Sequence, residues 1–232
     1  FGFGKSILDA VAIRDDPARE NLRLFNEITF YGSMGFRIFD SAIVPWFWHD
    51  AKEVSWQMSW IDLQSFGLIA AVLWGTQIYV GRVRPTSAYC DDPDRQGHLC
   101  DEDNPEFTRS FIAGHTATSV TAAGLTCVHH SQMPLYGGGV MDDVACGVMV
   151  TNAAVNAVTR LMVELHYPSD VAMGVVLGLT AGWVLPRALH YGWGDKARRN
   201  RADTRQRTPD IRLNLSPAVI EERPGLMLLG RF

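Results

Sequence analysis

Residues 159–189 read TRLMVELHYPSDVAMGVVLGLTAGWVLPRAL, a polar segment followed directly by a long apolar stretch. Pro168 fits the first turn of a helix, because a proline there loses no intrahelical hydrogen bond. We therefore expect a helix over Val171–Leu189, with His166 and Asp170 at its start. These two residues are spaced i, i+4 and share a helix face, so the carboxylate could orient the imidazole. Plain structural support is the alternative for such a pair.

Further apolar stretches predict an all-α fold, a polytopic membrane bundle. Met58–Val80 has 23 residues, which at about 1.5 Å each are enough to cross a hydrocarbon core of about 30 Å. Gly114–His130 is rich in small residues, which allow close helix packing in membranes. Val140–Val163 is another expected helix, and its Asn152 and Asn156 fit hydrogen bonds between helices. No stretch sustains the alternation of a β-strand.

The chain divides into three predicted parts: an N-terminal peripheral segment (1–21), a membrane helical domain (22–193) and a basic C-terminal tail (194–232). Within the membrane domain, Leu22–Trp48 carries several charges, which favours a helix packed inside the bundle over one facing lipid. The net charge of −4 gives no reason to expect nucleic acid as a partner.

Basic residues soon after the last helix predict that its C-terminal end lies in the cytoplasm. Counting spans back from there places three polar segments together on the periplasmic or exterior face of the inner (plasma) membrane. The basic residues are Lys196, Arg198, Arg199, Arg201, Arg205 and Arg207.

Four cysteines fall into two pairs. Cys127 and Cys146 lie in apolar helical stretches and are interpreted as small buried hydrophobic residues. Cys90 and Cys100 flank a polar loop, where a disulfide is expected if the loop faces an oxidising compartment. Two free thiols are the alternative, and a metal site there is the weakest interpretation.

Three polar segments are the candidates for chemistry. His115 follows Gly114 at a helix start, where backbone amides and the helix dipole favour an anion. Arg84 and Arg160 lie at helix ends and could bind a phosphate in bidentate fashion. Each residue alone is more often an interface anchor or a cap, but their joint occurrence at one membrane face indicates a phosphate site. The segments are Gln77–Pro85, Ile112–His115 and Thr159–Asp170.

These segments resemble the three signature motifs of the type 2 phosphatidic acid phosphatases, a superfamily that also contains bacterial acid phosphatases and vanadium haloperoxidases. The family pattern is Lys-x6-Arg-Pro, then Pro-Ser-Gly-His, then Ser-Arg-x5-His-x3-Asp. The third motif is the most specific and matches as Arg160-x5-His166-x3-Asp170. With the surrounding helices, the resemblance covers most of Met58–Leu189.

The resemblance implies a phosphatase that works through a phosphohistidine. His166 would attack phosphorus, with Asp170 orienting it. His115 would protonate the leaving oxygen and then activate water. Neither a metal nor another cofactor would be needed, because positive charge and amide groups stabilise the phosphate oxygens. The groups that would hold these oxygens are Arg84, Arg160 and the backbone amide of Gly114.

Two positions depart from the family pattern. Gln77 stands at the position of the family lysine, and Ala113 at that of the serine, so a cation and a hydroxyl donor are missing. Loss of one preorganised donor typically lowers the rate about 10²–10³-fold. Arg82 could substitute for the cation, but on a continuing helix it would point away from Arg84.

Two functions are compatible with this pattern. One is a membrane phosphatase that hydrolyses a lipid phosphate or pyrophosphate reached from the bilayer. The other is a catalytically silent family member that acts as a structural or lipid-binding subunit, with the tail after Gly194 docking onto a protein partner. The retained His115, His166 and Asp170 favour the enzyme, and the two departures favour the silent subunit. A vanadate-dependent haloperoxidase is a weaker third alternative, because the missing cation weakens vanadate binding equally.

Overall fold

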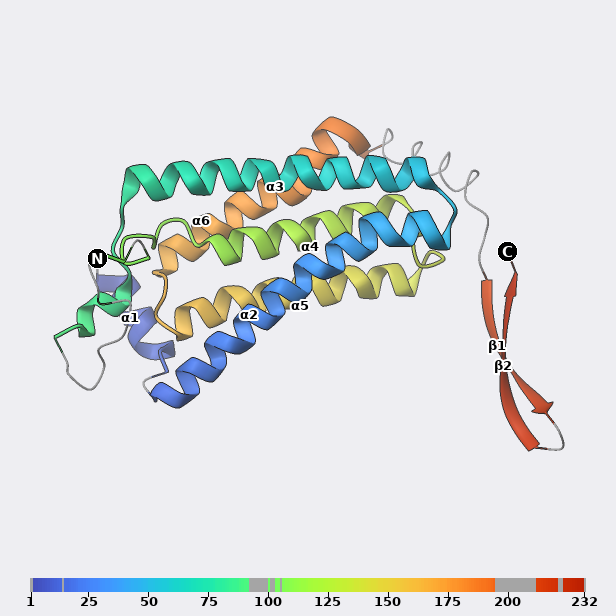
Figure 1. Ribbon diagram of the computed structural model, residues 1–232, viewed down its shortest axis with the longest axis horizontal. Helices are drawn as coiled ribbons and strands as arrows, with labels where there is room; N and C mark the ends of the chain where they lie inside the picture. The colour runs from blue at the N-terminus through green and yellow to red at the C-terminus, as the bar shows by residue number, and fades with distance from the viewer. Residues whose placement is uncertain are drawn as a thin grey trace.

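The computed structural model is a bundle of long helices that run along a common axis (Figure 1). The residues that it describes are 2–13, 15–91, 100, 103–104, 106–194, 212–220 and 223–231. The helices are α1 (Gly2–Val11), α2 (Asp16–Ile38), α3 (Lys52–Val80), α4 (Gly114–Gln132), α5 (Val140–Met162) and α6 (Pro168–Leu179). The all-helical bundle that the sequence predicts is confirmed.

Helix α4 lies at the centre of the bundle and contacts α2, α3, α5 and α6 (Figure 1). Most of its residues are buried, and many of them are alanine, glycine or threonine. Gly178 of α6 shows how close the neighbouring backbones come, since a Cβ there would lie 2.6 Å from the carbonyl oxygen of Ala117. Small side chains therefore set the spacing between α4 and α6.

Three helical stretches are long and apolar enough to cross a membrane: Lys52–Ala88, Val140–Met162 and Pro168–Tyr191. The last of them continues α6 through two π-helical segments, Thr180–Val184 and Arg187–Tyr191. These stretches contain most of the apolar spans expected from the sequence. They confirm the prediction of transmembrane helices.

Helix α2 continues into a π-helical segment, Phe39–Trp48, and turns its polar face inward. Asn26 and Arg37 are almost completely buried, whereas Phe25 and Ile28 are exposed. A polar interior with an apolar exterior is the arrangement expected of a helix packed within a membrane bundle. The helix begins at Asp16, before the predicted boundary at residue 21, because the Asp15 side chain caps it.

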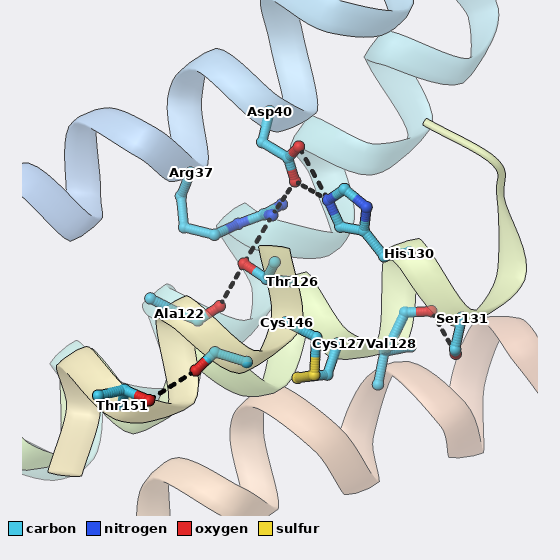
Figure 2. The surroundings of a disulfide bond; sticks show 11 residues. Arg37, Asp40, Ala122, Thr126, Cys127, Val128, His130, Ser131, Cys146 and Thr151 are labelled. Atoms are coloured by element: carbon cyan, nitrogen blue, oxygen red, sulfur yellow. Dashed lines mark hydrogen bonds and ion pairs between the residues drawn. A yellow bond between two sulfur atoms is a disulfide. The ribbon is translucent and has the colours of Figure 1, made fainter. Parts of the chain in front are cut away.

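Two disulfides are present among the described residues. One joins Cys90 to Cys100 across the polar loop that follows α3. The other joins Cys127 of α4 to Cys146 of α5 (Figure 2). The interpretation of this second pair as plain hydrophobic residues was wrong, because the antiparallel packing of α4 and α5 brings the two sulfurs together.

The tail contains an antiparallel hairpin of β1 (Arg212–Ile220) and β2 (Arg223–Arg231), in which Arg212 pairs with Arg231. This hairpin differs from the expectation that the chain contains no strand, because the alternation of polar and apolar residues in Arg212–Ser216 is too short to indicate one. The basic residues 196–207, which predict the cytoplasmic end, lie outside the described residues.

Candidate active site

The predicted site residues gather at one end of the bundle. There α3 and α5 end and α4 and α6 begin (Figure 1). Ala113, just before α4, donates its backbone N–H to the carbonyl oxygen of Asp170 at 3.2 Å, which joins the second and third motifs. Gly114 starts α4, so its amide is one of the first-turn donors without an intrahelical acceptor.

His166 lies in the short connection between α5 and α6 and is 4% exposed. Its Nδ1 lies 2.6 Å from the backbone carbonyl oxygen of Ser110. A carbonyl oxygen only accepts, so Nδ1 carries the proton and Nε2 presents its lone pair. Burial, together with the positive charge of Arg84, holds the pKa of His166 well below its ordinary value of 6.5. His166 is therefore a neutral imidazole with one nitrogen available as a nucleophile.

Asp170 is completely buried and accepts several hydrogen bonds. Its donors are the Ser110 hydroxyl at 2.6 Å, Arg82 Nη1 at 2.5 Å and the Tyr167 backbone N–H at 3.0 Å. Asp170 was expected to orient His166 directly. Its carboxylate instead accepts from the Tyr167 backbone N–H and caps the start of its own helix, α6. Ser110 stands between the two predicted partners, with its hydroxyl on Asp170 and its carbonyl on His166.

The side chain of Arg82 lies at the site, although on a continuing helix it was expected to point away from Arg84. Helix α3 ends at Val80, and Gly81 adopts a left-handed conformation with φ of 55°, so Arg82 is not on a helix. Its guanidinium contacts Asp170 and lies 4.2 Å from the centre of the Tyr167 ring. Arg82 therefore neutralises a buried carboxylate and is not placed as the substitute cation.

The other two arginines also have carboxylate partners. Arg84 is buried and donates to Glu106 Oε2 at 3.1 Å. Arg160 is buried at the end of α5 and donates to Glu27 Oε1 at 2.9 Å. The other oxygen of Glu27 lies 3.1 Å from His115 Nε2. Glu27 belongs to α2, so this helix contributes directly to the site.

One departure from the family pattern concerns the position of the family lysine. Gln77 is half-buried in the last turn of α3, one turn beyond Leu73, whose side chain would meet a Cβ added to Gly114 at 3.5 Å.

Sequence reasoning missed Ser110, Glu27 and Glu106 as members of the site. Glu27 had one signal, a charge inside an otherwise apolar helix, which in a membrane protein marks a functional or packed position. Within the described ranges, no group of three or more His, Cys, Asp or Glu side chains is suited to a metal ion. The convergent arginines and helix start are instead suited to an anion.

Comparison with known proteins shows the family to which the chain belongs. The family model of the PAP2 superfamily matches residues 63–193, more than half of the chain. Decaprenylphosphoryl-5-phosphoribose phosphatase of Mycobacterium tuberculosis, in strains CDC 1551 / Oshkosh and ATCC 25618 / H37Rv, is 34% identical over 93 residues. The match covers 40% of this chain and 44% of that phosphatase, so the chain spans less than half of its relative. No solved structure gives a significant match.

Proposed function

Because the chain belongs to the PAP2 superfamily, we propose that it is a membrane phosphatase that hydrolyses a lipid phosphate or pyrophosphate through a phosphohistidine. The observation that carries the proposal is the hydrogen bond from His166 Nδ1 to the Ser110 carbonyl oxygen at 2.6 Å. It fixes the tautomer that leaves Nε2 free to attack. The low pKa of His166 keeps this nitrogen unprotonated at neutral pH.

The reaction would run in two balanced steps. His166 Nε2 forms a bond to phosphorus while the bond from phosphorus to the leaving oxygen breaks, and His115 gives that oxygen a proton. Water then attacks the phosphohistidine, His115 takes a proton from it, and the N–P bond breaks to release phosphate. Arg84 and Arg160 would stabilise the charge on the phosphate oxygens during both steps.

A lipid substrate is supported by an apolar groove of about 680 Å³ between α4, α5 and α6. Val120, Ala157 and Val175 line it. Ala157 precedes Arg160 by one helical turn, so the lining of the groove ends one turn of α5 before the site. We assign this groove to the hydrocarbon chain of the substrate, whose phosphate would lie at the helix ends.

The name of the mycobacterial relative suggests one substrate class to test. That protein acts on decaprenylphosphoryl-5-phosphoribose, a phosphorylated sugar on a prenyl lipid. By analogy, a lipid-linked sugar phosphate joins phosphatidic acid and prenyl pyrophosphates as a candidate here. The site would face the periplasm or exterior, as the count of spans from the basic tail predicts.

The test is release of inorganic phosphate by the detergent-purified chain from phosphatidic acid, a prenyl pyrophosphate and a prenyl-linked ribose phosphate. We expect release from at least one of them and its loss in His166→Ala. His190→Ala serves as the matched control, because His190 is exposed, bonds Gln64 at 2.7 Å and lies at the far end of the helical stretch Pro168–Tyr191 from His166. Equal background in the wild type and His166→Ala would contradict the proposal.

A catalytically silent subunit is the second candidate function. The observation that favours it is the pairing of Arg84 with Glu106 and of Arg160 with Glu27. Both phosphate-binding arginines thus meet protein carboxylates in a site that already lacks the family lysine and serine. Such a protein would bind lipid phosphate without turnover, and its tail would dock onto a partner.

A further inference from the structure

Glu27 occupies the phosphate site from outside the region that defines the family. It lies on α2, whereas the family model begins at residue 63. Its carboxylate nevertheless reaches two of the groups that the proposed mechanism assigns to the phosphate. One oxygen accepts from Arg160 at 2.9 Å, and the other lies 3.1 Å from His115 Nε2.

This geometry matches what a bound phosphate requires. In the proposed reaction, one phosphate oxygen faces the Arg160 guanidinium, and the leaving oxygen faces His115. A carboxylate that bridges the same two side chains takes both positions at once. Because His115 Nε2 carries at most one proton, the leaving oxygen and the Glu27 carboxylate cannot both contact it, and Glu27 also takes one of the donors of Arg160.

The exposure of the carboxylates shows which of them can leave. Asp170 is 0% exposed and is held by Arg82, whereas the Glu27 side chain is 32% exposed and that of Glu106 is 47% exposed. Of these, Glu27 is the one that contacts both Arg160 and His115. Movement of this side chain into solvent would open the space between the two.

The backbone of α2 is fixed beside Glu27, so only the side chain needs to move. Asn26 donates to Asn156 Oδ1 at 3.1 Å and also to the Thr159 hydroxyl on α5. Arg23 lies four residues before Glu27 on the same helix face, where the displaced carboxylate can pair with it. Phe30, one turn further along, packs on the His115 ring with centroids 4.2 Å apart.

We propose that Glu27 is the resident counter-ion of the anion site and that a terminal phosphate must displace it from Arg160 and His115 in order to bind. The identity of the ligand rests on the proposed function. Glu27 thereby sets the affinity for phosphate, although it lies outside the three motif segments.

The experiment measures binding of inorganic phosphate to the full chain in detergent by isothermal titration calorimetry, for wild type, Glu27→Gln and Glu20→Gln. Glu20 is an exposed residue of the same helix and controls for the change in charge. A like charge about 4 Å away weakens anion binding about tenfold or more. We expect Glu27→Gln to bind phosphate at least about tenfold more tightly than wild type, and Glu20→Gln to match wild type.

Equal or weaker binding by Glu27→Gln, or no binding, would overturn the inference, because Glu27 would then support the site instead of competing in it. If Glu27→Gln fails to fold, Glu27→Asp replaces it. The shorter side chain cannot bridge both partners equally well, so binding tighter than wild type supports the inference and unchanged binding overturns it. The measurement needs no turnover, so a chain without hydrolysis but with this gain would refute the proposed enzyme and leave the role of Glu27 standing.

Discussion

Replacement of Asp40 by asparagine tests the buried ionic network at the end of the bundle opposite the candidate site. Asp40 follows α2, is 0% exposed and accepts from three side chains. Two of its donors are Arg37 Nη1 at 2.6 Å and His130 Nε2 at 3.0 Å (Figure 2). The third is the Tyr136 hydroxyl at 2.9 Å. Asparagine has nearly the same shape, so the substitution removes charge without opening a cavity.

The charge of Asp40 matters because two cations meet at it. His130 has a second carboxylate, that of Asp142, at 2.6 Å from Nδ1. Ionised carboxylates accept only, so both ring nitrogens of His130 donate and the ring is an imidazolium. Arg37 also contacts Asp62 at 2.7 Å. Asp40 thus balances part of the charge of both Arg37 and His130 in a buried region of the bundle.

Breaking a buried ion pair by removing one partner typically costs about 3–5 kcal/mol, because an uncompensated charge remains. At roughly 2–4 °C per kcal/mol for a chain of this size, Asp40→Asn should lower the melting temperature by about 6–20 °C. The assay is thermal unfolding in detergent, followed by intrinsic fluorescence. Asp143→Asn on α5 is the matched control, because Asp143 is exposed. A shift for Asp40→Asn no larger than that of the control would refute the account of the network.

Three further predictions concern the candidate site. Ser110→Ala removes the 2.6 Å hydrogen bond to Asp170. Because a hydrogen bond to a charged group contributes roughly 1.5–3 kcal/mol, the variant should have a kcat about tenfold lower with little change in KM. Full activity would show that the contact between Ser110 and Asp170 is dispensable. Because the folded pKa of His166 lies below 6.5, the unfolded chain binds the extra proton as pH falls below that value, so stability decreases there by up to about 1.4 kcal/mol per pH unit. Melting temperatures of wild type and His166→Gln, measured from mildly alkaline to mildly acidic pH, should fall less at acidic pH in the variant. Equal decreases in both proteins would contradict a buried neutral imidazole at His166. Gln77→Lys should raise kcat/KM about tenfold by restoring a cation near Gly114, with Gln57→Lys at the far end of α3 as its control; no gain over that control would place position 77 outside the site.

The apolar helices and the clustering of the motifs could be predicted from the sequence. Lipid-facing helices need long apolar windows, so Met58–Val80 and Val140–Val163 were recognisable without knowledge of the packing. The positions of the polar segments at the ends of these helices then followed from the up-and-down order of the spans. The family model covers residues 63–193, close to the stretch Met58–Leu189 to which the resemblance was assigned.

The contacts that define the chemistry could not be predicted, because they join distant elements. Glu27 and Arg160 are separated by 133 positions, and only the packing of α2 on α5 brings them together. The Cys127–Cys146 disulfide had a weak signal in the sequence, since the two cysteines lie on either side of the glycines 137–139 that separate two antiparallel helices. No sequence signal indicated the contact between Ser110 and His166, because Ser110 makes it with its backbone carbonyl oxygen.

The most direct measurement of the central claim is the detection of a phosphate bonded to His166 during turnover. The purified chain is mixed with its best lipid substrate, quenched in alkali to preserve phosphohistidine, digested and analysed by mass spectrometry. A phosphorylated peptide containing His166, present in the wild type and absent from His166→Ala, is the predicted result. Phosphate release without any phosphorylated His166 peptide would contradict the account and assign the attack on phosphorus to another group.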